Sequence, residues 1–283
     1  MSKILNGREL AQTNKIIITN KVNKLTTRKP QLAVLIIGNH LPSTIYVRNK
    51  IKACQDCGIF GKIIALDSHV SQEEVINHIK RLNSDSTVDG ILVQLPLPAH
   101  LNTFTIINSI DINKDVDGLT NVNAGRLLQG DPNAIIPCTV KGILALLTHY
   151  KIPIKGQNVT IINDSNIVGK PLALLLTNLG ATVSITHKLT ADLSIYTANA
   201  NIICTATGVH NIINANQVKK GVTIIDIAIN YQGANKKIVG DVDFTSMSNK
   251  ASAITPVPGG VGPMTIAMLL VNLMICYELT NKS

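Results

Sequence analysis

The chain contains no tryptophan, and aromatic residues make up only 3% of its 283 residues. Nucleic-acid-binding proteins usually combine aromatic stacking surfaces with blocks or stripes of basic residues. Here the formal net charge is +9, yet no basic block is longer than a pair such as Lys219-Lys220. We therefore expect no nucleic-acid partner, and we expect the positive charge to attract anionic small molecules.

Membrane and secretion signals are also lacking. The longest apolar stretch, residues 266–277, is interrupted by Asn272 and is too short to span a bilayer. No basic segment followed by an apolar core opens the sequence. Five widely spread cysteines, an odd number, do not form a disulfide framework. The sequence predicts a soluble, cytoplasmic protein without a membrane partner.

Metal and redox motifs are sparse. Cys54 and Cys57 form a C-x-x-C pair, but it lies at the end of a helix pattern, whereas reactive pairs lie at helix starts. There is no second pair and no H-x-x-x-H spacing. We expect structural cysteines and no metal site.

Apolar runs alternate with helical patterns in both halves of the chain. Strands are predicted over residues 31–37, 61–66, 91–94, 159–162, 182–185, 202–205 and 222–227, and helices over 42–57, 139–150 and 169–179. A further helix opens at Ser71, where Glu74 completes a capping box. This alternation predicts an α/β protein with parallel sheets. The pattern pauses between Gly118 and Pro137, so we place a domain boundary there, with domains of residues 1–118 and 119–263.

The most distinctive stretch runs from Thr255 to Thr265, with three prolines and three glycines in eleven residues. Proline fixes φ and glycine permits positive φ, so this composition specifies a shaped loop rather than a packed element. An apolar helix pattern over residues 264–277 follows, with Pro263 in its first turn. Such a loop suits close contact with a planar or phosphorylated ligand.

The segment Pro256-Val257-Pro258-Gly259-Gly260-Val261-Gly262-Pro263-Met264-Thr265 resembles the signature of bifunctional methylenetetrahydrofolate dehydrogenase/methenyltetrahydrofolate cyclohydrolases. Further matches, in the family's order, are Y-V-R-N-K at 46–50, D-G-I-L-V-Q-L-P-L-P at 89–98, K-D-V-D-G at 114–118, P-C-T at 137–139 and S-N-I-V-G-K-P at 165–171. The resemblance covers nearly the whole chain.

The resemblance implies an N-terminal catalytic domain, which the C-terminal helix 264–283 rejoins, and a Rossmann-like NAD(P)-binding domain. It implies NADP-dependent oxidation of 5,10-methylenetetrahydrofolate, followed by hydrolysis of the methenyl product to 10-formyltetrahydrofolate, without a metal. The implied partners are tetrahydrofolate derivatives, with or without a polyglutamate tail, and a second copy of the chain in a homodimer.

On the folate side, Tyr46 and Lys50 lie four residues apart on a predicted helix, so they share one face. A buried lysine amine can transfer protons when its surroundings favour the neutral form. The resemblance implies that Lys50 is the essential catalytic group, oriented by Gln94, with Tyr46 stacking on the pterin. It also implies that Asp117 binds the pterin nitrogens and that the Pro258-Gly259-Gly260 backbone lies near folate, while Asp115 braces the turn.

On the cofactor side, a predicted strand ends at a loop that lacks the usual G-x-G-x-x-G motif. The resemblance implies cofactor contacts from Asn163, Asp164, Ser165, Val168, Lys188, Ile229 and Thr265. Asn163 stands where glycine is common in the family, and we expect asparagine to tolerate the left-handed φ of such a turn. Asp164 stands where some members have arginine, and its charge would repel an NADP 2′-phosphate. Lys188 follows the second strand, where a basic residue favours NADP over NAD.

Two alternatives remain open from the sequence. The chain could be a dehydrogenase only, or one that uses NAD, with Asp164 as the motivating residue. It could also be a non-catalytic basic binding protein, although the joint presence of Tyr46, Lys50, Gln94 and Asp117 argues against this.

Overall fold

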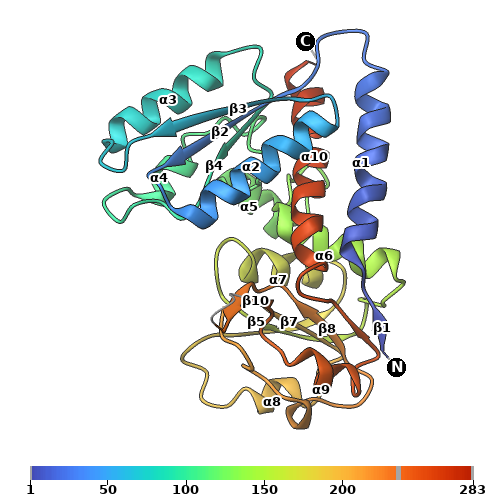
Figure 1. Cartoon of the computed structure of the whole chain (residues 1–283). Coiled ribbons are helices and arrows are strands. Elements are labelled where there is room, and N and C mark those ends of the chain that lie inside the picture. The colour runs from blue at the N-terminus through green and yellow to red at the C-terminus, as the bar shows by residue number, and fades with distance from the viewer. Residues whose placement is uncertain (1, 234–236, 282–283) are drawn as a thin grey trace. The chain divides into compact units, whose positions relative to one another are not determined.

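The structure, a computed structural model, describes residues 2–233 and 237–281. The chain divides into two compact units, which we name after their sheets (Figure 1). The three-strand unit comprises Gln12–Cys138 and Ile266–Ser283, and the six-strand unit comprises Met1–Ala11 and Thr139–Thr265. The end of the C-terminal helix therefore belongs with the N-terminal part of the chain, as predicted.

The three-strand unit is built on a small parallel sheet in the order β3-β2-β4. Its strands are β2 (Gln31–Ile37), β3 (Phe60–Leu66) and β4 (Gly90–Val93). The helices of this part of the chain are α1 (Gly7–Asn23), α2 (Leu41–Asp56), α3 (Gln72–Ser84), α4 (Thr103–Ile107), α5 (Asn121–Gln129) and α10 (Val261–Thr280), of which α1 and α10 extend past the unit's limits. Ser71 caps α3 through the predicted capping box with Glu74.

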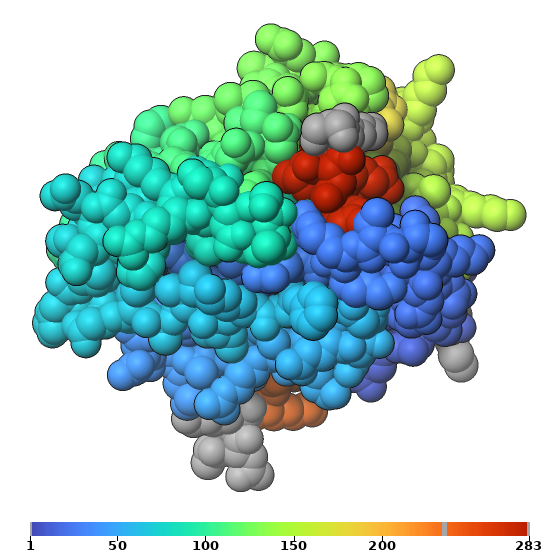
Figure 2. Space-filling view, turned by 90° about the horizontal axis from the view of Figure 1, so that it is seen from above, coloured from blue at the N-terminus to red at the C-terminus, as the bar shows by residue number. Residues whose placement is uncertain are grey.

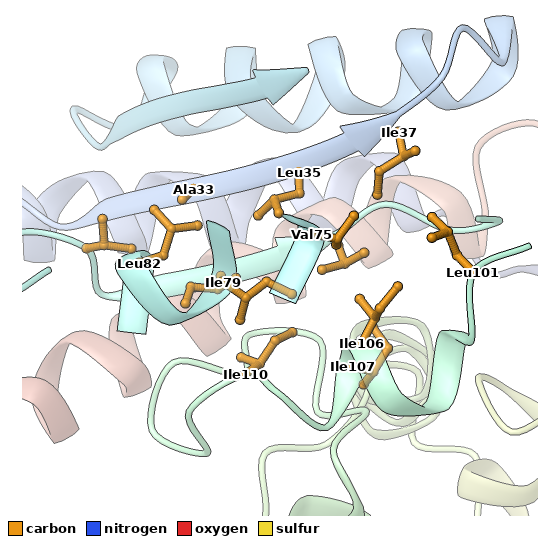
Figure 3. Close-up of a cluster of buried hydrophobic side chains, with 13 residues drawn as sticks. Ala33, Leu35, Ile37, Val75, Ile79, Leu82, Leu101, Ile106, Ile107 and Ile110 are labelled. Atoms are coloured by element: carbon orange, nitrogen blue, oxygen red, sulfur yellow. The ribbon is translucent and has the colours of Figure 1, made fainter. Parts of the chain in front are cut away.

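Alternate side chains of β2 face opposite sides of this sheet. Ala33, Leu35 and Ile37 point toward α3 and α4, and Figure 3 shows them facing Val75 and Ile79. On the other side the backbone at Gly90 approaches α10 so closely that a Cβ would lie 2.6 Å from Leu273 Cδ1. Both faces of the sheet are therefore covered at β2 and β4, which explains why these two strands are apolar runs, whereas the edge strand β3 is largely exposed.

The buried carboxylate of Asp89 ties the end of α10 to this sheet. Both Asp89 carboxylate oxygens accept hydrogen bonds from Arg28, at 2.6 and 2.7 Å, and Asp89 is fully buried. Thr280 Oγ1 and the Gln31 N–H also donate to Asp89, at 2.9 and 2.8 Å. Figure 2 shows the end of α10 enclosed by segments from the first half of the chain. Asp89 thus anchors the C-terminal helix to the unit.

We expect Asp89→Ala to lower the free energy of unfolding by about 3 kcal/mol, because it removes one partner of a buried pair and leaves several donors unsatisfied. Urea denaturation followed by circular dichroism measures this change. The matched control is Asp56→Ala, which breaks the exposed pair with Lys52 and should cost less than about 1 kcal/mol. Equal costs for the two variants would contradict the anchoring role of Asp89.

The six-strand unit contains a parallel sheet in the order β1-β11-β8-β7-β5-β6. Its strands are β1 (Lys3–Ile4), β5 (Asn158–Ile162), β6 (Thr182–Thr186), β7 (Ile202–Thr205), β8 (Thr223–Asp226) and β11 (Ala253–Ile254). Shorter elements are the hairpin of β9 (Asn230–Gln232) and β10 (Lys237–Val239), the helices α6 (Cys138–His149), α7 (Gly169–Asn178), α8 (Ser194–Thr197) and α9 (Phe244–Ser248), and the 3₁₀ helix η1 (Ala215–Gln217). After β5 the chain adds β6 on one side and β7 on the other, so the strand order reverses at β5. In doubly wound folds, ligands bind at the carboxyl ends of the strands beside such a reversal.

The predicted α/β class is confirmed, but several elements differ from the prediction. The interval 119–137, expected as an irregular pause, contains α5, capped by Thr120 at its start and by Gly130 with φ 71° at its end. The helix α1 and the β9-β10 hairpin were not predicted. The C-terminal helix begins at Val261, three residues earlier than expected, and Pro263 still lies in its first turn.

The helix α10 is longer than the apolar stretch predicted from the sequence, which bears on whether it could cross a membrane. At 20 residues it is long and apolar enough to cross a membrane by length and composition, so the limit of 266–277 set from the sequence was wrong. However, 61% of its most apolar window is buried inside the protein, as in the core helix of a folded domain.

The thiols of Cys54 and Cys57 are buried as well, and burial raises the pKa of Cys54 to about 12, which fits structural cysteines.

Candidate functional site

Lys50 and Gln94 meet in the three-strand unit. The helix α2 places Tyr46 and Lys50 one turn apart, and Lys50 is only 7% exposed. The Lys50 ammonium donates to Gln94 Oε1 at 3.1 Å, and Gln94 Nε2 donates to the Leu95 carbonyl at 2.7 Å. Among the ion pairs of the described residues none involves Lys50, and the acceptor of its 3.1 Å hydrogen bond is a neutral amide. An amine held in this way can exchange a proton without first breaking an ion pair.

The segment from Lys114 to Gly118 lies beside β4. A parallel bridge pairs Ile91 with Asp115, so the chain reaches Asp117 at the same carboxyl end of β4 where Gln94 follows. Lys114 Nζ donates to three carbonyls at the end of α3, at 2.8–3.0 Å, and burial lowers its pKa. These bonds fix the backbone that carries Asp117.

Asp115 and Asp117 have different surroundings. Asp115 is 1% exposed, and its carboxylate accepts bonds from the Leu119 and Thr120 amides, the Thr120 hydroxyl and the Asn123 amide. Burial raises the pKa of Asp115. It thus braces the turn into α5, as expected, whereas Asp117 is half-buried and remains accessible to a ligand.

The loop that precedes α10 is held by close backbone contacts in the six-strand unit. Gly259 has φ 117°, and a Cβ on Gly260 would lie 2.7 Å from the Pro256 carbonyl oxygen. Thr265 Oγ1 lies 3.2 Å from Thr139 Oγ1. The two glycines are therefore required by the backbone path. The loop offers polar atoms from its main chain, and Thr265 on α10 offers a hydroxyl beside it.

The loop after β5 is organised by the side chain of Asn163. Its Oδ1 accepts bonds from the Ser165 hydroxyl at 2.6 Å and the Gly169 amide at 3.1 Å, and its Nδ2 donates to the Ala206 carbonyl at 2.7 Å. Asn163 is not among the residues with positive φ, so the expected left-handed conformation is wrong. The Val168 amide also donates within the loop, to Ser165 Oγ at 3.2 Å. The first amides of α7 are thus used internally rather than presented to a phosphate.

A pocket of about 370 Å³ opens at the carboxyl ends of β5, β6 and β7, where the strand order reverses. Its walls include three predicted cofactor residues, Asn163, Asp164 and Lys188, while Ser165, Val168, Ile229 and Thr265 are not among its lining residues. The lining residues are Ile162, Asn163, Asp164, His187, Lys188, Leu189, Leu193, Thr207, Val209 and Ile212. Apolar and polar side chains together line this pocket, a combination that suits a nucleotide.

Opposite charges face this pocket. Asp164 and Lys188 are both exposed. In the described part of the chain, residues 2–233 and 237–281, no ion pair joins these two side chains. Lys188 therefore remains available to an anionic ligand. The sequence did not single out His187, Thr207 or Val209, although each closely follows a predicted strand end.

The sequence analysis also did not identify two buried carboxylates near the carboxyl ends of the strands of the six-strand sheet. Asp226 ends β8 and is 2% exposed, and Asp241 is fully buried. Burial raises the pKa of Asp226 to about 6. The sequence could have indicated Asp226, because it is a polar residue at the end of the apolar run Thr223–Asp226. Asp241 follows a short hairpin, and no local pattern marks it as buried. No three His, Cys, Asp or Glu side chains gather as a metal site in the described part of the chain.

Comparison with known proteins identifies the family of this chain. Residues 5–117 match the family model for the catalytic domain of tetrahydrofolate dehydrogenase/cyclohydrolase, and residues 137–281 match the model for the NAD(P)-binding domain of the same family. The chain belongs to the tetrahydrofolate dehydrogenase/cyclohydrolase family. The resemblance predicted from the motifs is thereby confirmed.

Relatives within this family match over nearly their whole length. The bifunctional protein FolD of Hydrogenobaculum sp. is 49% identical, over 97% of this chain and 98% of the relative. The crystal structure of the bifunctional FolD enzyme from Campylobacter jejuni is similar with a TM-score of 0.96 and 44% identity, over 99% of this chain and 100% of that one. The FolD of Trypanosoma brucei, solved with NADP and an inhibitor, gives a TM-score of 0.95 and 32% identity, over 100% and 99% of the two chains.

Proposed function

We propose that this family member is a bifunctional enzyme that oxidises 5,10-methylenetetrahydrofolate and hydrolyses the methenyl product to 10-formyltetrahydrofolate. The observation that carries the proposal is the buried Lys50 ammonium, held 3.1 Å from the neutral Gln94 amide in a chain of this family. Without a carboxylate partner, this amine is suited to move protons rather than to stabilise the fold.

In this proposal the folate site is assembled from residues of α2, of the end of β4 and of the loop after it. Tyr46 offers a ring for the pterin to stack on, and Asp117 accepts hydrogen bonds from the pterin's amino and ring nitrogens. Lys50 assists attack of water on the methenyl carbon, directly or through an ordered water, and Gln94 keeps its ammonium in place. We also assign Pro258, Gly259 and Gly260 to folate binding. We assign the folate-binding domain to residues 1–118 and 264–283, and the cofactor domain to 119–263.

The pocket at the carboxyl ends of β5, β6 and β7 fits a nicotinamide dinucleotide. It lies at the reversal of strand order, and its apolar lining residues can cover an adenine while Asn163 and Ser165 shape the adjoining loop. When bound, NADP⁺ supplies the acceptor for the hydride that leaves the methylene carbon. Ile229, Val168 and Thr265 are assigned to the remaining cofactor contacts.

We propose NADP rather than NAD as the preferred cofactor. Lys188 lines the pocket and is free of an ion pair with Asp164, so its ammonium can pair with the 2′-phosphate. Asp164 is the one observation that favours the alternative, an NAD-dependent member, because its carboxylate lines the same pocket.

We further propose a cytoplasmic homodimer formed through the β6 edge of the six-strand sheet. Ile185 on β6 and Tyr196 on α8 are each 41% exposed, and Ile195 is 68% exposed. Unpaired edge strands with exposed apolar side chains pair readily with another chain. Sedimentation should show a dimer for the wild type and a monomer for Ile185→Lys; a monomeric wild type would contradict this interface.

The direct test of the function is an absorbance assay in two parts. Methylenetetrahydrofolate is supplied with NADP⁺ or with NAD⁺, and decay of methenyltetrahydrofolate is followed separately without a cofactor. Turnover in both parts, faster with NADP⁺, is expected. Oxidation without methenyl hydrolysis would leave a dehydrogenase only, and no turnover in either part would overturn the proposal.

A further inference from the structure

Asp241 is a fully buried carboxylate in the six-strand unit whose hydrogen bonds all come from uncharged donors. Its Oδ2 accepts from the Thr205 hydroxyl at 2.7 Å, the Thr207 hydroxyl at 2.9 Å and the Thr207 amide at 2.6 Å. Its Oδ1 accepts from Asn230 Nδ2 at 3.0 Å. The ion pairs of the described residues do not include Asp241. Burying a carboxylate without a charged partner costs free energy, which these four hydrogen bonds offset by holding the surrounding segments in place.

These bonds reach two parts of the edge that we assign to the cofactor. Thr207 lines the pocket at the end of β7, and Asn230 directly follows Ile229 after β8. Asp241 therefore joins the pocket wall to the segment that carries Ile229, although Thr207 lies 34 residues before Asp241 in the sequence.

The second carboxylate, Asp226, holds the other side of the same segment. It accepts from the Ala228 amide at 3.2 Å and the Val242 amide at 3.0 Å. A Cβ on Gly240 would lie 2.0 Å from Asp226 Oδ2, so the backbone before Asp241 packs directly against this carboxylate. Ile229 is thus flanked by Ala228, bound to Asp226, and by Asn230, bound to Asp241.

We propose that Asp241 is a positioning residue for the nicotinamide cofactor: through Thr207 and Asn230 it fixes the pocket wall and the Ile229 segment in the geometry that binds the dinucleotide. This inference rests on the proposed function, which assigns the pocket and Ile229 to the cofactor. It assigns to Asp241 no contact with the cofactor and no part in methenyl hydrolysis.

The test is the isosteric variant Asp241→Asn. If its amide oxygen keeps the three bonds of Oδ2, its NH₂ group faces the NH₂ of Asn230. If the Asn230 side chain rotates away, it loses a second hydrogen bond, because the same NH₂ donates to the Gly240 carbonyl at 3.0 Å. The change therefore acts on the residue next to Ile229.

For Asp241→Asn we expect about a tenfold rise in the Kd for NADP⁺, measured by fluorescence titration, and a similar rise in its KM. Methenyl hydrolysis, assayed without cofactor, should stay within about twofold of wild type, because that step does not use the dinucleotide. The matched control is Asp243→Asn, an exposed helix cap two residues away, which should leave Kd and both rates unchanged.

A second variant, Thr205→Val, tests the same inference if Asp241→Asn does not fold. It removes one donor to Asp241 from the fully buried Thr205, which does not line the pocket, and should raise the Kd about threefold. Unchanged or tighter NADP⁺ binding in both variants, or equal loss of binding and of methenyl hydrolysis, would overturn the inference. A wild type that binds NADP⁺ but turns over no folate would instead refute the proposed function.

Discussion

Replacing Lys50 by methionine should lower the rate of methenyltetrahydrofolate hydrolysis by about 10²–10⁴-fold, the range expected when a general acid or base is removed. Methionine keeps most of the volume of a side chain that is only 7% exposed, so the helix α2 should remain packed. The variant loses only the ammonium and its bond to Gln94. Stopped-flow absorbance of the methenyl compound, with circular dichroism to confirm folding, measures the effect.

The control for this variant lies two residues away on the same helix. Lys52 carries the same charge but is exposed and paired with Asp56. Lys52→Met should therefore hydrolyse the methenyl compound at the wild-type rate. A Lys50→Met variant that hydrolyses at a near-normal rate would remove Lys50 from the mechanism, whatever the effect on oxidation.

Reversing the charge of Lys188 should raise the KM for NADP⁺ by about 10–100-fold in Lys188→Glu, because a charge-assisted contact becomes a repulsion. NAD⁺ lacks the 2′-phosphate, so its KM should change little. Initial rates with the two cofactors, under the same folate concentration, give the comparison. The expected result is a change in cofactor preference rather than a loss of activity.

The neighbouring charge supplies a matched variant of opposite sign. Asp164→Asn removes a carboxylate from the same pocket and should lower the KM for NADP⁺ by a few fold, with little effect on NAD⁺. If Lys188→Glu changes the KM for both cofactors equally, Lys188 does not recognise the 2′-phosphate and the preference for NADP has another origin.

Local patterns in the sequence predicted much of the fold. The strands Gln31–Ile37 and Ile202–Thr205 have the predicted limits, because each is a continuous apolar run with clear breaks at its ends. The start of α3 followed from Ser71 and Glu74, whose reciprocal hydrogen bonds need only four residues. On the site, the resemblance to the family pointed to Lys50 and Gln94, and the structure brings these two residues together.

The remaining features depend on contacts between distant residues. The short, polar helix α5 is stabilised by Asp115, which binds Thr120 and Asn123 from outside the helix. The position of Asp241 behind the cofactor edge follows from the path of the β9-β10 hairpin, which local periodicity does not encode. Asn163 could be recognised as unusual from the sequence, but its role depends on Ala206, more than forty residues away.

The central claim, that one chain carries out both steps, is tested most directly by the product balance of the wild-type enzyme. Methylenetetrahydrofolate and NADP⁺ are incubated with the enzyme, and NADPH and 10-formyltetrahydrofolate are quantified in the same samples. We predict equal amounts of the two products, with 10-formyltetrahydrofolate formed faster than free methenyltetrahydrofolate hydrolyses in buffer. NADPH accompanied only by methenyltetrahydrofolate, or no NADPH at all, would contradict the account.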